Sequence, residues 1–117
     1  MQDFKNLKVW QKAHELALYT YRVTADFPKE ELFGLRNTLR KTSVDIPACI
    51  AEGCAKPNDA EFGRLIATSI TLGNRLEYYA LMARDLKMLN HAVHTEYLDR
   101  IVEVRKMLSG FNRSLEL

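Results

Sequence analysis

Apolar residues recur at helical spacing along almost the whole of this chain, and only three short stretches interrupt them. The interruptions fall around Phe27-Pro28, Pro57-Asn58-Asp59 and Asn90-His91. Three prolines and five glycines in 117 residues leave too few turns for an all-β fold. The pattern therefore predicts an all-α fold in which short connections join four helices into an antiparallel, up-down-up-down bundle, with residues 1–117 forming one domain.

Each interruption contains residues that end or begin a helix. Pro28 cannot continue the first helix but fits near the start of the second. Asn58 or Asp59 can accept hydrogen bonds from the free N–H groups at the start of the third helix. Asn90 is expected to end the third helix, and the fourth is expected to start near Thr95.

The first and fourth helices each show one apolar face and one solvated face. In the first helix the expected buried side contains Val9, Trp10, Ala13, His14, Leu16, Ala17, Tyr21, Val23 and Phe27. Its expected solvated side contains Lys8, Lys12, Glu15, Tyr19, Arg22 and Asp26. In the fourth helix the expected inner residues are Tyr97, Ile101, Val104, Leu108, Phe111 and Leu115, and the expected outer residues are Asp99, Arg100, Glu103, Lys106 and Arg113.

The second and third helices each carry more apolar residues than one face can hold. The main seam of the second contains Leu32, Leu35, Leu39, Thr42, Ile46, Cys49 and Gly53. Its other seam, about 200° away, contains Val44, Ala48, Ala51 and Ala55. The third helix adds a second seam of Leu65, Leu72, Tyr79, Met82, Leu86 and Leu89 beside its main seam of Phe62, Ile66, Ser69, Gly73, Leu76, Ala80 and Ala83. Because a chain this small rarely buries helices all round, we expect self-association, although alanines are also tolerated on surfaces.

The segment DIPACIAEGCAK, residues 45–56, places unusual residues inside the second helix. Pro47 lacks an N–H group and predicts a bend, and Gly53 would let another helix approach closely. Cys49 is interpreted as a small core residue. If Glu52 is buried or lies at an interface, it needs a basic partner or a backbone donor, because an unpaired buried charge is costly.

No catalytic or metal-binding pattern is found. Cys49 and Cys54 would point about 140° apart on one helix, which disfavours a disulfide between them and favours reduced thiols. Neither cysteine has the close spacing of zinc ligands, and His91 and His94 are expected to be capping or solvent-exposed residues at a helix junction. We therefore expect no enzyme activity, no metal, no cofactor and no small-molecule substrate.

The charge balance and the N-terminus restrict the partners. Seventeen basic and fifteen acidic residues give a net charge of +2, too balanced to predict nucleic-acid binding by itself. A local cluster of Arg36, Arg40 and Lys41 could hold phosphate, or it could pair with Glu30, Glu31 or Asp45. No stretch approaches 18 uncharged apolar residues and the N-terminus lacks a signal-peptide core, which predicts a cytoplasmic protein without membrane contact.

Three stretches carry a family resemblance: FKNLKVWQKAHELA, FPKEELFGLRNTLRKTSVDIPACIAEG and LEYYALMARDLKML. The most specific residues are Phe27-Pro28, Glu31, Gly34-Leu35, Arg40-Lys41 and Ile50-Ala51-Glu52-Gly53. In their order and spacing the chain resembles the four-helix-bundle proteins encoded in 23S ribosomal RNA intervening sequences. It departs from the family pattern at Thr38, Lys41, Cys49, Thr71-Leu72 and Arg75.

The resemblance implies a homo-oligomer, typically a pentameric ring, without established enzyme activity. It also suggests ribosomal RNA or another nucleic acid as a partner. A distantly similar family, the accessory proteins of diversity-generating retroelements, is pentameric and implicated in binding nucleic acid.

Two functional hypotheses follow. The first is a non-enzymatic, homo-oligomeric scaffold or binding protein that contacts nucleic acid. In it, the expected phosphate contacts are Arg36, Arg40, Lys41, Lys56 and Arg64, and the expected oligomer interface is Val44, Ala48, Ala51, Glu52 and Ala55. The second is a protein-protein interaction module with no nucleic-acid role.

Overall fold

The computed structural model describes residues 2–31 and 34–115, and these residues form helices and turns without any strand. The elements are a 3-10 turn η1 (Phe4–Asn6), helix α1 (Lys8–Val23), a second 3-10 turn η2 (Lys29–Glu31), and helices α2 (Leu35–Cys54), α3 (Asp59–Asp85) and α4 (His91–Ser114). The predicted all-α, four-helix fold is confirmed. None of the described helices is long and apolar enough to cross a membrane.

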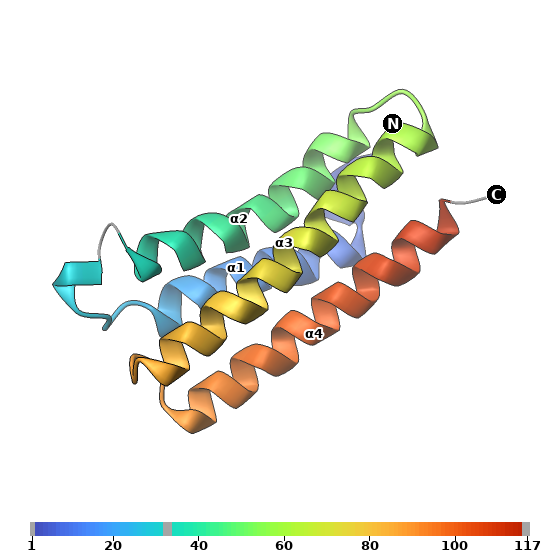
Figure 1. Cartoon of the computed structure of the whole chain (residues 1–117). Helices are drawn as coiled ribbons and strands as arrows, with labels where there is room; N and C mark the ends of the chain where they lie inside the picture. Colours follow the sequence, from blue (N-terminus) through green and yellow to red (C-terminus); the bar gives the residue numbers. More distant parts are fainter. Residues whose placement is uncertain (1, 32–33, 116–117) are drawn as a thin grey trace.

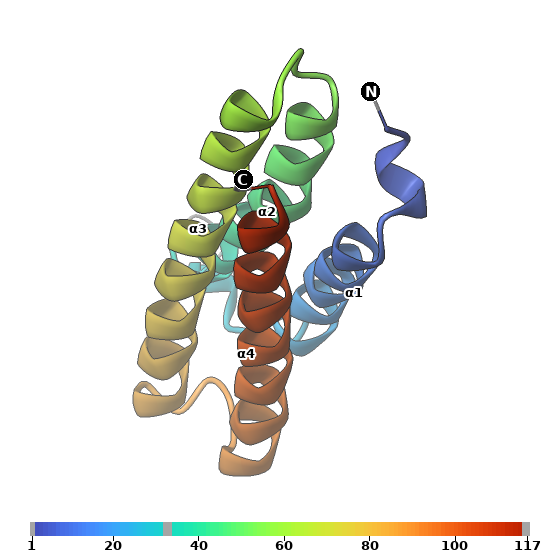
Figure 2. The same cartoon turned by 90° about the vertical axis from the view of Figure 1, so that its right-hand side faces the viewer.

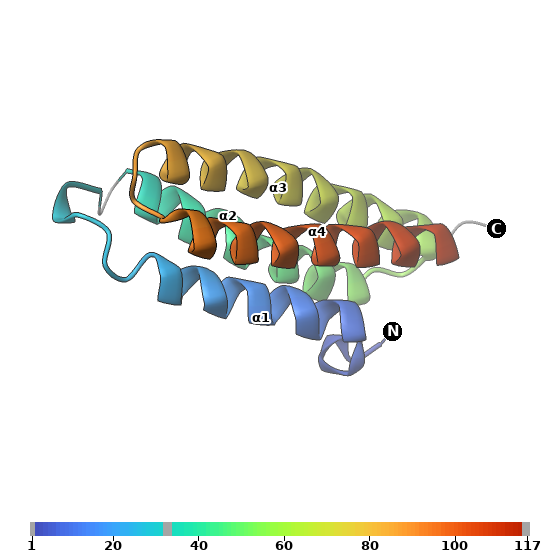
Figure 3. The ribbon, with the colours of Figure 1, turned by 90° about the horizontal axis from the view of Figure 1, so that it is seen from below.

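Successive helices run in opposite directions along a molecule that measures 45 × 23 × 20 Å (Figure 1). Helix α1 packs against α2 and α4, and α3 packs against the same two helices, so the four surround one core (Figure 2). The start of α1 and the end of α4 lie at the same end of the bundle, while η2 extends from the opposite end (Figure 3).

The core is formed where the apolar seams of the four helices meet. Its fully buried large side chains are Leu16, Leu39, Ile46, Ile50, Ile66, Leu76, Tyr97, Ile101 and Leu108. Phe111 and Leu115, expected to face inward, are partly buried against this core near the end of α4. The second seam predicted for the third helix is partly buried on α3 at Leu65, Leu72, Tyr79 and Met82. Its last two residues follow the end of α3, where Leu86 is exposed and Leu89 is buried.

Asparagine side chains cap the last two helices. Asn58 accepts a hydrogen bond from the Glu61 N–H at 2.9 Å, as one of the two predicted caps. Asn90 accepts one from the Val93 N–H at 2.8 Å, so it begins α4 instead of ending α3. Helix α3 ends earlier, at Asp85, and the chain turns through Lys87, whose φ of 65° is in the left-handed region. The prediction that α4 starts near Thr95 was therefore four residues late.

The prediction for α1 was wrong for two tyrosines. Tyr19, expected in solvent, is buried, and its ring centroid lies 5.7 Å from that of Tyr97 on α4. Tyr21, expected inside, is 45% exposed. The reason is the position of α1 between α2 and α4: its buried face includes Leu16 and Thr20 and extends toward α4 through Tyr19.

Helices α2 and α3 approach closely at the residue that the sequence indicated. A Cβ atom on Gly53 would lie 2.6 Å from Cδ1 of Phe62, so only glycine fits this contact without rearrangement. About two helical turns earlier on α2, the Ile46 carbonyl accepts a hydrogen bond from the Ser69 hydroxyl at 3.0 Å. Helix α2 continues through Pro47, which is buried. The expected close approach at Gly53 is confirmed.

Candidate interaction surfaces

The outer face of α2 remains uncovered by the rest of the bundle. Val44 is 41% exposed, Ala48 and Ala55 are exposed, and Ala51 is partly buried. These four residues repeat at helical spacing, which places them in one stripe. The stripe is therefore open to a partner.

Helix α1 extends this apolar surface. Tyr21 lines a shallow hollow of about 430 Å³ together with Val44, and Leu18, one helical turn before Tyr21, is 52% exposed. The α1–α2 face is defined here as Leu18, Tyr21, Val44, Ala48, Ala51 and Ala55. Of the five exposed large hydrophobic residues among those described, three lie on it, Leu18, Tyr21 and Val44.

Glu52 lies beside this face in solvent. Its carboxylate forms an ion pair with the Lys56 ammonium at 3.9 Å, one helical turn away, and its side chain is 60% exposed. The sequence predicts that Glu52 needs a basic partner if it lies at an interface. Lys56 is such a partner. Because exposed pairs of this kind contribute well under about 1 kcal/mol, the pair does not hold α2 together.

Arg40 forms contacts that link α2 to α1. Its Nε donates to the Thr24 hydroxyl at 2.9 Å, and the guanidinium donates to the Tyr21 carbonyl at 3.3 Å. The same guanidinium lies 4.5 Å from the centroid of the Tyr21 ring. Three interactions with α1 and the residue that follows it give Arg40 a packing role.

The other four predicted phosphate contacts lie in different surroundings. Lys41 forms an ion pair with Asp45 at 3.4 Å, and Arg40 and Lys41 border the same hollow at the α1–α2 face. The Arg36 Nε is buried without a hydrogen-bond partner among the described residues. Lys56 is held by Glu52, and Arg64 is exposed on α3. The structure brings together Arg40 and Lys41, and it places Lys56 and Arg64 elsewhere on the molecule.

The cysteines and histidines are dispersed, and within residues 2–31 and 34–115 no three His, Cys, Asp or Glu side chains are placed to hold a metal ion. Both thiols are free. Cys54 is buried in the core, whereas Cys49, interpreted as a core residue, is only partly buried. Burial raises the pKa of both thiols, and the nearby Glu52 carboxylate adds to the effect at Cys49.

Two histidines differ from their predicted surroundings. His14, expected inside, is exposed and stacks on the Trp10 ring at 4.9 Å between centroids. His94, expected to be a capping or exposed residue, is buried, and this burial lowers its pKa, with the positive charge of Arg84 acting in the same direction.

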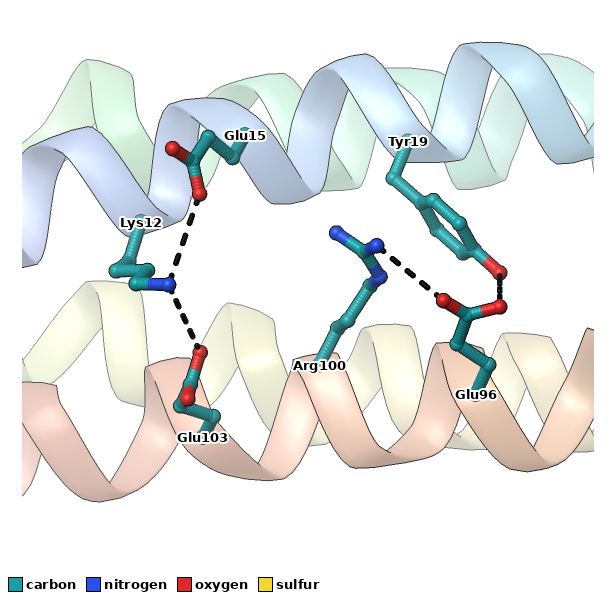
Figure 4. Close-up of polar contacts among 6 residues, drawn as sticks. All are labelled: Lys12, Glu15, Tyr19, Glu96, Arg100 and Glu103. Carbon is teal, nitrogen blue, oxygen red and sulfur yellow. Dashed lines mark hydrogen bonds and ion pairs between the residues drawn. The ribbon is translucent and has the colours of Figure 1, made fainter.

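A polar network joins α1 to α4 (Figure 4). The Lys12 ammonium lies 3.8 Å from Glu15 and 3.7 Å from Glu103. The Tyr19 hydroxyl donates to Glu96 at 3.1 Å. Arg100 donates to the other Glu96 oxygen at 3.3 Å and lies 4.1 Å from the centroid of the Tyr19 ring.

Sequence reasoning missed this network because it assigned most of these side chains to solvent. The sequence does contain a pattern that predicts this network, because the paired residues are spaced seven apart on both helices. Lys12 and Tyr19 are seven residues apart on α1, and their partners Glu103 and Glu96 are seven apart in reverse order on α4. Antiparallel helices pair residues in this reversed order. Lys12 and Arg100 each pair with carboxylates, so the network joins two helices and leaves no surplus positive charge for an anionic ligand.

Four antiparallel helices around one core, with an uncovered α1–α2 face, define the class of antiparallel four-helix-bundle proteins. The sequence model of the 23S rRNA-intervening sequence protein family matches residues 5–110, and the chain belongs to this family. No curated protein matches the chain.

A solved structure shares the fold. It is described as a protein with unknown function from the S23 ribosomal protein family of Bacteroides thetaiotaomicron. The TM-score is 0.79 at 17% sequence identity, and the alignment covers 89% of this chain and 97% of that one. At this identity the likeness supports the four-helix architecture.

Proposed function

We propose that this protein is a homo-oligomeric helical-bundle scaffold whose copies meet through the α1–α2 face. The observation that carries the proposal is the concentration of exposed Leu18, Tyr21 and Val44 on that face. Large apolar side chains exposed on neighbouring helices of a small protein favour an interaction site, and here Tyr21 and Val44 border the same hollow. The small side chains of Ala48 and Ala55 would allow the backbone of a neighbouring helix to approach closely.

The resemblance of the sequence suggests a pentameric ring. In a cyclic ring each subunit uses two different surfaces, so the α1–α2 face of one copy would meet another surface of the next. This arrangement repeats every surface charge around the ring. Cytoplasmic location and the absence of membrane partners belong to the same proposal.

Sedimentation analysis and light scattering test the assembly. We expect the wild-type protein to have a multiple of the 13.5 kDa chain mass. Ala48→Glu places a charge in the middle of the α1–α2 face and should lower the mass, because an unpaired charge at an apolar interface is costly. Ala67→Glu, at an exposed alanine of α3, is the matched control and should keep the wild-type mass. A wild-type protein that stays monomeric at high concentration would overturn the proposal.

The assembled protein is further proposed to bind RNA. The support is the set of surface cations Lys41, Lys56 and Arg64 together with the family resemblance. Arg36 and Arg40 remain candidate contacts, although Arg40 also packs against Tyr21. The competing proposal is a protein-interaction module in which the cations only balance nearby acids such as Asp45 and Glu52.

RNA binding at two salt concentrations separates the two proposals. An RNA-binding protein should lose affinity steeply as salt rises, because phosphate contacts release counterions. Replacing Lys41, Lys56 and Arg64 with Ala leaves the packing of Arg40 intact and should weaken binding. The control, Lys8, Arg22 and Lys29 changed to Ala, removes the same charge from other surfaces. No measurable affinity of the wild-type assembly at low salt would favour the interaction module.

A further inference from the structure

The outer side of the α3–α4 pair carries a groove that the sequence reasoning did not identify. Two hollows, of about 430 Å³ and about 520 Å³, both border Asn74 and therefore adjoin. The first extends along α3 to Arg84, and the second extends along α4 to Arg113. The α3–α4 groove is defined here by Asn74, Tyr78, Arg84, Arg105, Lys106 and Arg113. From Ile70 to Arg84 it spans roughly 21 Å along α3, at 1.5 Å for each residue.

Positive charge exceeds negative charge in this groove. Its lining contains the cations Arg84, Arg105, Lys106 and Arg113 and one carboxylate, Glu77. Arg105 is held between Glu77 and Asn74 and so has a fixed position, while Arg84 forms an ion pair with the neighbouring Asp85 at 3.0 Å.

The carboxylates of α4 do not line the two hollows themselves. Glu96 and Glu103 belong to the network on the α1 side, where Arg100 and Lys12 neutralise them (Figure 4). Asp99 and Glu103 both border a neighbouring hollow that also reaches Lys106. Among the groove cations, Arg84 and Arg105 form ion pairs with Asp85 and Glu77, whereas Lys106 and Arg113 form no ion pair with the described residues.

An exposed aromatic ring, Tyr78, lies in the first hollow with Arg84, and the other cations line the adjoining hollow. Tyr78 is 58% exposed, the highest fraction among the exposed large hydrophobic residues that the structure describes. Its ring centroid lies 6.2 Å from that of Tyr79, which supports it from the same helix. A basic groove with an accessible aromatic ring is the combination that binds single-stranded nucleic acid, because the cations hold phosphates and an unpaired base stacks on the ring.

We infer that the α3–α4 groove binds single-stranded RNA, with Lys106 and Arg113 at backbone phosphates and Tyr78 stacked against one base. This inference rests on the proposed RNA-binding function, and it names the site and the form of the strand. A base must be unpaired to stack on Tyr78, so the groove favours a single strand over a duplex of the same sequence.

Binding of a fluorescent single-stranded RNA and of its duplex tests the charges. Lys106→Glu with Arg113→Glu should weaken single-strand binding more than tenfold, because two phosphate contacts become repulsive. The control, Lys8→Glu with Lys29→Glu, makes the same change in net charge at exposed positions outside the groove and should weaken binding much less. The wild-type protein should prefer the single strand to the duplex.

Substitutions of Tyr78 test base stacking separately from the contribution of the positive charges. Tyr78→Ala should weaken single-strand binding about tenfold, and Tyr78→Phe, which keeps the ring, should bind like the wild type. A light-scattering measurement on each variant checks assembly. If the Tyr78 or Lys106 variants lose mass, the groove is a contact between copies and the inference is overturned.

The remaining outcomes distinguish the inference from the function on which it rests. If the wild-type assembly binds no RNA, the proposed RNA-binding function fails, and the groove inference fails with it. If the wild type binds RNA and the groove variants bind equally well, the groove is the wrong site and the RNA-binding function stands.

Discussion

The hydroxyl groups of Thr20 and Tyr97 lie 2.7 Å apart in the core, where they join α1 to α4. Thr20 also donates its single hydroxyl hydrogen to the Leu16 carbonyl at 2.9 Å. Tyr97 must therefore be the donor between the two hydroxyls. Burial raises the pKa of Tyr97 well above its usual value, so its proton stays in place at neutral pH.

Because Tyr97 donates and Thr20 accepts, removing one hydroxyl should lower the free energy of unfolding by a different amount from removing the other. Thr20→Val leaves the buried Tyr97 hydroxyl without an acceptor and should lower the free energy of unfolding by about 1–3 kcal/mol. Tyr97→Phe leaves Thr20 bonded to Leu16 and should cost about 1 kcal/mol. In the double variant the two changes should cost less than their sum, because no unsatisfied hydroxyl remains. Urea denaturation of the four proteins gives the values, and additive costs would contradict the assignment.

Two glycines should respond in opposite ways to alanine. Gly53→Ala puts a Cβ 2.6 Å from the Phe62 ring, and the overpacking cost of about 1–3 kcal/mol should outweigh the gain in helix propensity. Gly73→Ala is the matched control in α3, where a new Cβ meets nothing within 4 Å. It should stabilise the protein by up to about 1 kcal/mol through helix propensity alone. Thermal melting that ranks Gly53→Ala at or above Gly73→Ala would disprove the close contact.

The cap of α4 should be measurable by substitution. Asn90→Ala removes the acceptor for the Val93 N–H and should cost about 1 kcal/mol, whereas Asn90→Gly should cost only a few tenths. Denaturant unfolding of both variants gives the comparison. Equal costs for alanine and glycine would show that Asn90 does not cap this helix.

His94 should make stability depend on pH in mildly acidic solution. Its pKa in the folded protein is below its ordinary value of 6.5, because burial and Arg84 disfavour the charged ring and outweigh the opposing Asp85 and Glu77. The unfolded chain therefore binds more protons, so the free energy of unfolding should fall as pH decreases through 6.5 toward the folded pKa.

Urea denaturation from neutral to mildly acidic pH measures this slope. His94→Gln removes the titrating group and should flatten the pH dependence in that range. His91→Gln, at an exposed position one turn away, should keep most of the slope, because burial and Arg84 lower the pKa of His94 more than His91 does. A His94→Gln slope equal to that of the wild type would exclude His94 as its source.

The fold was predictable because its boundaries depend on local chemistry, and the details that failed depend on distant residues. Asn58 identifies the start of α3 from its own side-chain chemistry. Pro28, expected near the start of the second helix, instead lies in the connection between Val23, where α1 ends, and Leu35, where α2 begins. Asn90 was assigned to the wrong helix because asparagine is favoured both after a helix and at the start of one. Tyr19 was misplaced because helix periodicity alone does not show that α4 lies beside this edge of α1.

The candidate surfaces were predictable only in part. The stripe on α2 follows from spacing, and the structure leaves it exposed as the sequence indicated. The role of Arg40 could not be foreseen, because its partners Thr24 and Tyr21 are 16 and 19 residues earlier in the chain. The α3–α4 groove combines residues of two helices, which no single-helix pattern can reveal.

Two contacts on either side of a helical segment limit how α2 can slide along α3. Apolar ridges alone permit a shift of one helical turn, because the next turn offers similar side chains. Here the Ser69 hydroxyl reaches the Ile46 carbonyl, and seven residues later Gly53 admits the Phe62 ring. A shift of one turn would break both contacts at once. The exposed stripe of α2 therefore has a fixed position along the bundle, which is what the proposed assembly of identical subunits would need.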